Sequence, residues 1–195
     1  RSSAPEARVL QDELNAIRPA SVALIQADLH DTGGLPGLVH QTVATFCGLD
    51  VLLNNASSFY PTPVGDITEK DWVDLMGSNL KAPMFLSQAA APELKKRCGC
   101  IINITDIHAD RPMKSYVVYS VAKAGLVGLT KSLARELAPA LTAAATGPST
   151  ENTEPRSGSD FTRAGCSSTR LMRSTIESPS PSPRSTFAPS CRRWN

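Results

Sequence analysis

The chain has 195 residues, which is enough for one domain with its own core. Its formal charge of +2 is too small to predict a nucleic-acid or anionic-membrane partner, and no stretch is long and apolar enough to cross a bilayer. The sequence opens Arg-Ser-Ser without a secretory signal or methionine, so we expect a fragment of a cytoplasmic protein.

The cysteines and histidines do not predict a metal centre. Five cysteines are an odd number, and Cys98-Gly-Cys100 has neither metal nor redox spacing. We therefore expect free cysteines in a reducing compartment. The three histidines, His30, His40 and His108, are scattered, and no pair stands at ligand spacing. We expect no metal.

The first part of the chain predicts two helices and two short strands. Pro5–Ile17 has the periodicity of an amphipathic helix, and Leu35–Phe46 is a second helix that follows a Gly-Gly breaker. Ser21–Gln26 is a short β-rich run, and Asp50–Leu53 reads as a buried strand.

The next part predicts three helices and one strand. Thr68 opens, with a capping-box pattern, a helix that reaches about Gly77. Asn79–Arg97 is a further helix, Cys100–Thr105 is a buried strand, and Ser115–Leu137 is a long helix. Strands that alternate with helices in this way predict an α/β fold with a parallel sheet.

The composition changes at Pro139-Ala140. From Leu141 onward serine, threonine, proline, arginine and glycine dominate, and valine, lysine and tyrosine are absent. Such a segment buries too little apolar surface to offset its ordering entropy. We expect a domain over 1–139 and a low-complexity tail over 140–195, either disordered or translated out of frame. An arginine-containing interaction tail is the functional alternative.

Tyr119, Lys123 and Asp106 form the most informative pattern in the chain. Residues four apart share one face of a helix, so Tyr119 and Lys123 are expected to point into the same cavity. An ammonium near a phenol favours phenolate, so we expect Lys123 to lower the pKa of Tyr119. Asp106 follows a predicted strand, at the carboxyl end where open α/β sheets bind ligands. An ordinary helix with a core tyrosine and a surface lysine is the alternative.

Three spaced motifs carry a family resemblance. Ile101-Ile102-Asn103-Ile104-Thr105-Asp106 with Tyr119-Ser-Val-Ala-Lys123 resembles the short-chain dehydrogenase/reductase superfamily. Asn54-Asn55-Ala56 resembles that family's NNAG motif, and Asn79 matches its active-site asparagine. Aspartate at 106, where most of the family has serine, and the run from Asn54 to Pro63 resemble the pteridine reductase and dihydromonapterin reductase branch. The resemblance runs from Arg1 to about Pro139.

The resemblance implies a reaction: NADPH-dependent reduction of a pterin, with hydride passing to a ring C=N bond. Tyr119 is then the proton donor, Asp106 assists proton delivery and binds the pterin, and Lys123 holds the nicotinamide ribose. Asn79 completes the catalytic set as the holder of a relay water. Two of these residues have structural alternatives, Asp106 as a turn cap and Asn79 as an N-cap.

The resemblance also implies binding residues. Phe59 is expected to stack on the pterin, and Ser57 to contact both the pterin and the cofactor phosphate. On the cofactor side the expected residues are Arg1, Ser2, Asp28, Asn54, Ala56, Ser57, Tyr119 and Lys123. Arginine suits the 2′-phosphate, which favours NADPH over NADH. The alternatives are a loop aromatic for Phe59, a strand-end turn for Asn54, a loop cap for Asp28 and a frayed terminus for Arg1.

The sequence also departs from the family pattern. It has no Gly-rich phosphate loop, and only counterparts of the family's third, fourth and fifth strands are evident. We therefore predict a partial Rossmann-like, doubly wound parallel sheet that lacks the first two strands and the last strand. Ser21–Gln26 should pair with Asp50–Leu53 or remain loosely held. The alternatives are that the chain itself is inactive, that it is another short-chain carbonyl reductase, or that it is a non-catalytic oligomerising fragment. For the intact family member the resemblance implies a homotetramer.

Overall fold

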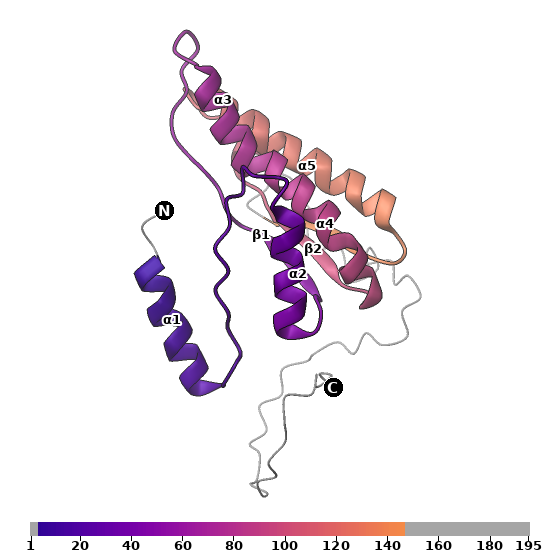
Figure 1. Ribbon diagram of the computed structural model, residues 1–195. Coiled ribbons are helices and arrows are strands. Elements are labelled where there is room, and N and C mark those ends of the chain that lie inside the picture. The colour runs from indigo at the N-terminus through magenta and orange to yellow at the C-terminus, as the bar shows by residue number, and fades with distance from the viewer. Residues whose placement is uncertain (1–3, 147–195) are drawn as a thin grey trace, which may run out of the picture.

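The computed structural model describes residues 4–146 and shows an α/β arrangement around a small parallel sheet (Figure 1). Three strands, β1 (Val51–Asn54), β2 (Cys100–Ile104) and β3 (Thr142–Thr146), pair in the order β1-β2-β3. Both pairings are parallel, and the register places Asn54 opposite Asn103. The predicted fold class, with strands and helices alternating along the chain, is confirmed.

Helices cover one face of this sheet. They are α2 (Leu35–Phe46), α4 (Ala82–Lys96) and α5 (Val117–Leu137), which lie side by side in Figure 1. Buried residues of these helices meet Ile101 of β2 in one apolar core, and Leu52 and Ala143 of the neighbouring strands pack against it. Val51 and Leu53 of β1 point the other way and are 50% and 54% exposed. The alternation of side chains along each strand therefore separates a covered face from an open one.

A continuous helical run leads from the loop after β1 into α4. It begins with α3 (Glu69–Met76), passes through a π-helical turn (Gly77–Lys81) and continues as α4. The predicted capping box is present, because the Thr68 and Asp71 side chains each accept from the other's backbone N–H. The sequence predicted two helices with a boundary near Gly77. The structure instead joins them through the π turn. The proline at the start of α4 does not interrupt this run, because proline is tolerated in the first turn of a helix.

Of the two outcomes expected for Ser21–Gln26, pairing as a strand with Asp50–Leu53 is wrong, and the run remains unpaired. These residues lie outside the sheet and have no regular structure. Their backbone groups bond to side chains of α1 (Ala4–Ile17) instead: Gln11 and Asn15 both donate to the Val22 carbonyl, at 3.1 and 3.0 Å. In the family topology two strands would separate this run from the counterpart of β1. A strand without neighbours gains no ladder hydrogen bonds, and the segment accordingly does not pair with β1.

The absence of any further strand after Pro139 was also expected, and this prediction is wrong as well. β3 follows α5 and pairs along its whole length with β2, while Leu141 just before it is buried. The alanines and threonines of this segment give only a weak strand signal in sequence. The segment nevertheless forms a strand, because the open edge of β2 supplies hydrogen-bonding partners for its backbone. The expected disordered or out-of-frame tail falls, from residue 147 onward, outside the described residues.

Two cysteines differ from expectation. Cys47 and Cys98 are disulfide-bonded, whereas Cys100 is a free thiol whose pKa is raised by burial. The prediction of free cysteines is therefore wrong for the first two.

Among residues 4–146 no helix is long and apolar enough to cross a membrane. The same part of the chain contains no cluster of three or more side chains suited to hold a metal ion.

Candidate active site

Tyr119 and Asp106 are in direct contact, as their spacing predicted. Asp106 follows the end of β2, and Tyr119 lies in the first turn of α5. The Tyr119 hydroxyl donates a hydrogen bond of 2.8 Å to Oδ2 of Asp106, while its ring is 4% exposed. The other carboxylate oxygen accepts from the His108 backbone N–H at 3.0 Å and so caps a 3-10 turn, Ile107–Ala109. Asp106 therefore caps this turn, as one alternative predicted, and also accepts the hydrogen bond of the phenol.

Lys123 lies one helical turn after Tyr119 and is also 4% exposed. Its ammonium donates to the Ile104 carbonyl at 2.9 Å, and Nζ lies 5.6 Å from the centre of the Tyr119 ring. Burial lowers the pKa of Lys123, and the charge of Asp106 opposes this shift. The lysine is thus anchored to the end of β2 beside the phenol ring.

The expected lowering of the Tyr119 pKa does not occur. Burial raises the pKa of Tyr119, and its hydrogen bond to the Asp106 carboxylate and the charge of that carboxylate raise it further. For Asp106, burial acts to raise the pKa, but bonds from His108 and Tyr119 and the charges of His108 and Lys123 outweigh it and lower the pKa. At neutral pH the pair is therefore a protonated phenol that donates to an ionised carboxylate.

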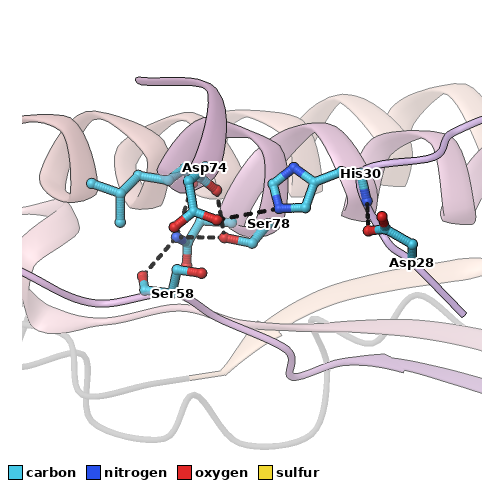
Figure 2. A network of polar contacts seen from close by, with 7 residues as sticks. Asp28, His30, Ser58, Asp74 and Ser78 are labelled. Atoms are coloured by element: carbon cyan, nitrogen blue, oxygen red, sulfur yellow. Dashed lines mark hydrogen bonds and ion pairs between the residues drawn. The ribbon is translucent and has the colours of Figure 1, made fainter. Parts of the chain in front are cut away.

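Asn79 lies in the π turn and is 1% exposed. Its amide donates to the backbone carbonyls of Leu75 and Ser58, both at 2.9 Å, and its carbonyl oxygen accepts from the Ser57 hydroxyl at 2.5 Å. Figure 2 shows part of this network with Ser58, Asp74 and Ser78. The alternative role of N-cap is wrong, because the helical run is continuous through this position. Asn79 instead fixes the loop after β1 to the helix.

Phe59 lies beside the reactive pair and is 52% exposed. Its ring stacks on Tyr116 with centroids 4.6 Å apart, and it meets the Tyr119 ring edge-on at 4.7 Å. The Val118 N–H donates to the Thr62 hydroxyl at 3.3 Å, which attaches the loop after β1 to the start of α5. A half-exposed aromatic side chain is therefore held next to the phenol of Tyr119.

A buried polar network that the sequence did not predict joins the strands to α5. The Asn54 amide donates to the side-chain oxygen of Asn103 at 2.7 Å and to Ser87 at 3.4 Å. Asn103 donates in turn to the hydroxyl of Thr130 at 2.8 Å. Asn103 stood in the predicted strand as a polar residue among isoleucines, which was the signal that could have identified it. The Asn54 amide thus has internal partners that fix the strand ends carrying the site.

A comparison with protein families finds that residues 1–160 match the short chain dehydrogenase model. The chain belongs to the short-chain dehydrogenase family. It is 37% identical to pteridine reductase 1 of Leishmania tarentolae over 174 residues, covering 70% of this chain and 60% of that protein. It is 35% identical over 137 residues to the 3-oxoacyl-[acyl-carrier-protein] reductase FabG of Staphylococcus aureus, covering 70% and 55%. The match over residues 1–160 establishes the family. The identities to the two reductases are similar, so they do not distinguish between branches of the family. The chain spans somewhat more than half the length of these relatives.

Within the short-chain dehydrogenase pattern, the expected cofactor-side residues lie in several places. Ala56 and Ser57 are exposed in the loop after β1. Asp28 accepts from the His30 N–H at 2.9 Å and lines a cavity of about 240 Å³ together with residues of the N-terminal turn of α2. Arg1 and Ser2 lie outside the described residues.

His30 connects the turn that carries Asp28 to α3, as Figure 2 shows. Its Nε2 lies 3.4 Å from the Asp74 carboxylate, and a Cβ at Gly77 would stand 2.5 Å from its ring. Glycine at position 77 is therefore what allows this close approach. The sequence offered no signal for this contact, because His30 and Asp74 lie far apart in the chain.

Proposed function

We propose that this site reduces a C=N bond of a pterin with hydride from NADPH. The observation that supports it most directly is the Tyr119–Asp106 hydrogen bond, which places a carboxylate where most of the family has a serine. A carbonyl oxygen needs only a neutral donor to polarise it, whereas a basic ring nitrogen can also use a carboxyl group. Similarity to a pteridine reductase also supports this choice.

The residues take distinct parts in this reaction. When bound, NADPH supplies the hydride. Tyr119 gives its proton to the ring nitrogen. Asp106 accepts the hydrogen bond of the Tyr119 hydroxyl before the reaction, and it also binds the pterin. Phe59 offers its exposed face for stacking, and Ser57 contacts the pterin edge. The ordered loop held by Asn79 keeps the last two residues beside Tyr119.

The fit of the chain to NADPH differs between the two ends of the cofactor. At the nicotinamide end Lys123 is anchored by one of its three N–H donors, which suits an ammonium that bonds to ribose hydroxyls. Asn54, Ala56 and Asp28 are proposed to contact the remainder, with Arg1 and Ser2 at the 2′-phosphate. For the pyrophosphate, the 195-residue sequence has no G-x-G-x-x-G loop between a strand and a helix.

Reduction of a carbonyl is the second candidate, because a FabG protein is nearly as similar as the pteridine reductase.

For the intact protein we also propose a homotetramer. Hydrophobic side chains that α4 and α5 leave partly exposed support this assembly, namely Met84, Val117 and Val121.

Exchanging Asp106 for the serine of most relatives separates the two candidate reactions. We expect Asp106→Ser to lower kcat/KM for a dihydropterin by about 10²-fold while a β-keto thioester is reduced at least as well as before. Steady-state NADPH consumption at high cofactor concentration, in a protein that joins this site to a Gly-rich phosphate loop, measures both reactions. Asp110→Ser, a change at an exposed position nearby, is the matched control. Equal losses on both substrates would assign Asp106 a structural role and remove the support for pterin reduction.

A further inference from the structure

The imidazole of His108 stands next to the reactive pair and has no part in the reaction proposed above. Its Nε2 lies 3.9 Å from Oδ1 of Asp106, and its ring meets the Tyr119 ring at 6.5 Å with a 68° interplanar angle. The side chains of His108 and Asp106 are 24% and 30% exposed. The imidazole therefore lies between solvent and the carboxylate that holds the Tyr119 hydroxyl.

The hydrogen bonds of His108 define which nitrogen faces the carboxylate. Nδ1 lies 3.1 Å from the Arg111 carbonyl, and a carbonyl can only accept, so Nδ1 carries a proton. Nε2 is then the nitrogen that gains and loses a proton, and it faces Asp106 at about 1 Å beyond hydrogen-bond contact. Loss of the Nε2 proton leaves the bond to Arg111 intact, so the ring can change charge without changing its tautomer or its anchor.

We propose that His108 is a proton-relay residue that acts through Asp106 and returns a proton to Tyr119 after each reduction. This inference rests on the proposed function. The protons balance as follows: the product nitrogen takes the Tyr119 proton, the Asp106 carboxylate takes the Nε2 proton of His108 at Oδ1 as a proton passes from Oδ2 to the Tyr119 phenolate, and water returns a proton to Nε2. The His108 side chain is 24% exposed, so water has access to the imidazole beside the carboxylate. Histidine is the side chain best suited to exchange protons with water near neutral pH.

Substitution of His108 is expected to leave the local fold in place. The Asp106 carboxylate caps the turn by accepting from the backbone N–H of residue 108. The Ala109 N–H bonds to the Asp106 carbonyl, and the Arg111 N–H bonds to the Ile107 carbonyl. None of these bonds uses the imidazole. His108→Gln and His108→Ala therefore remove the relay and keep the cap of Asp106.

The relay can be tested without cofactor by exchange of the Tyr119 hydroxyl proton with water. The complete chain is labelled with ¹³C at tyrosine Cζ and observed by NMR in mixed H₂O and D₂O; Tyr119→Phe identifies the Tyr119 signal. We expect His108→Gln to slow exchange at Tyr119 by about tenfold or more, and added imidazole to restore it in His108→Ala. Tyr60 serves as an internal control, and His40→Gln, at an exposed position of α2, is the control variant.

Each result of this experiment is decisive. Unchanged exchange at Tyr119, or equal slowing at Tyr119 and Tyr60, overturns the relay. Slowed exchange at Tyr119 alone, with rescue by imidazole, supports it. NADPH-dependent pterin reduction is then measured separately. If the relay is present and a protein that joins this site to a Gly-rich phosphate loop does not reduce a dihydropterin, the proposed function is overturned and the relay stands.

Discussion

Replacing Tyr119 with phenylalanine is expected to lower turnover by about 10²-fold or more in a protein that joins this site to a Gly-rich phosphate loop. The substitution removes the hydroxyl that donates to Asp106 and keeps the ring that meets Phe59 edge-on. Asp106 retains its bond from the His108 N–H, so the turn after β2 should persist. Single-turnover kinetics and NADPH titration of the variant separate the loss of chemistry from any loss of binding.

Cofactor affinity should change little in this variant, because Lys123 keeps its anchor on Ile104. Tyr60→Phe is a matched control that removes a hydroxyl beside Asp74, outside the reactive pair. The Tyr60 pKa is raised to about 12 by burial and by that carboxylate. Turnover of Tyr119→Phe near the parent value would remove Tyr119 from the mechanism.

The 195-residue chain itself is expected to bind NADPH weakly or not at all. Asn54, Asp28 and Lys123 are each proposed to contact one part of the cofactor, but the sequence has no G-x-G-x-x-G loop between a strand and a helix for the pyrophosphate that joins those parts. Ser21–Gln26 lies outside the sheet, so the turn that carries Asp28 is attached to the rest of the domain through contacts such as His30 with Asp74. Any ordering of this segment at binding reduces the affinity.

Isothermal titration calorimetry of NADPH into the purified chain measures this directly. A short-chain dehydrogenase with an intact phosphate loop, titrated under the same conditions, shows the heat expected for a complete site. Micromolar, one-to-one binding by the 195-residue chain would contradict this prediction and show that the phosphate loop is dispensable.

The elements that could be predicted from sequence are those with strong local signals. The apolar periodicity of α2 and α5, the capping box at Thr68 and the isoleucine-rich run of β2 each specify their element within a few residues. The segments that were predicted wrongly depend on distant partners. Ser21–Gln26 has strand-like residues but no neighbouring strand, whereas β3 has weak strand residues and a neighbour that pairs with all of it.

The same distinction, between local sequence signals and contacts with distant residues, applies to the candidate site. The contact of Asp106 with Tyr119 follows from a strand end and a helix face, both readable in sequence. The direction of the Tyr119 pKa shift could not be predicted in this way, because it depends on burial and on the carboxylate bond rather than on the nearby lysine. Tyr116 and His108 were missed for a related reason, since their roles come from contacts with Phe59 and Asp106 that only the folded chain creates.

The measurement that tests the central claim most directly is the substrate preference of the unmodified site. It compares kcat/KM for a dihydropterin and for a β-keto thioester, at one high NADPH concentration, in a protein that joins this site to a Gly-rich phosphate loop. A carboxylate bonded to the donor phenol, beside an exposed aromatic face, predicts a preference for the dihydropterin of about 10²-fold or more. Equal activity on the two substrates, or a preference for the thioester, would contradict the assignment and return the site to the carbonyl reductases of its family.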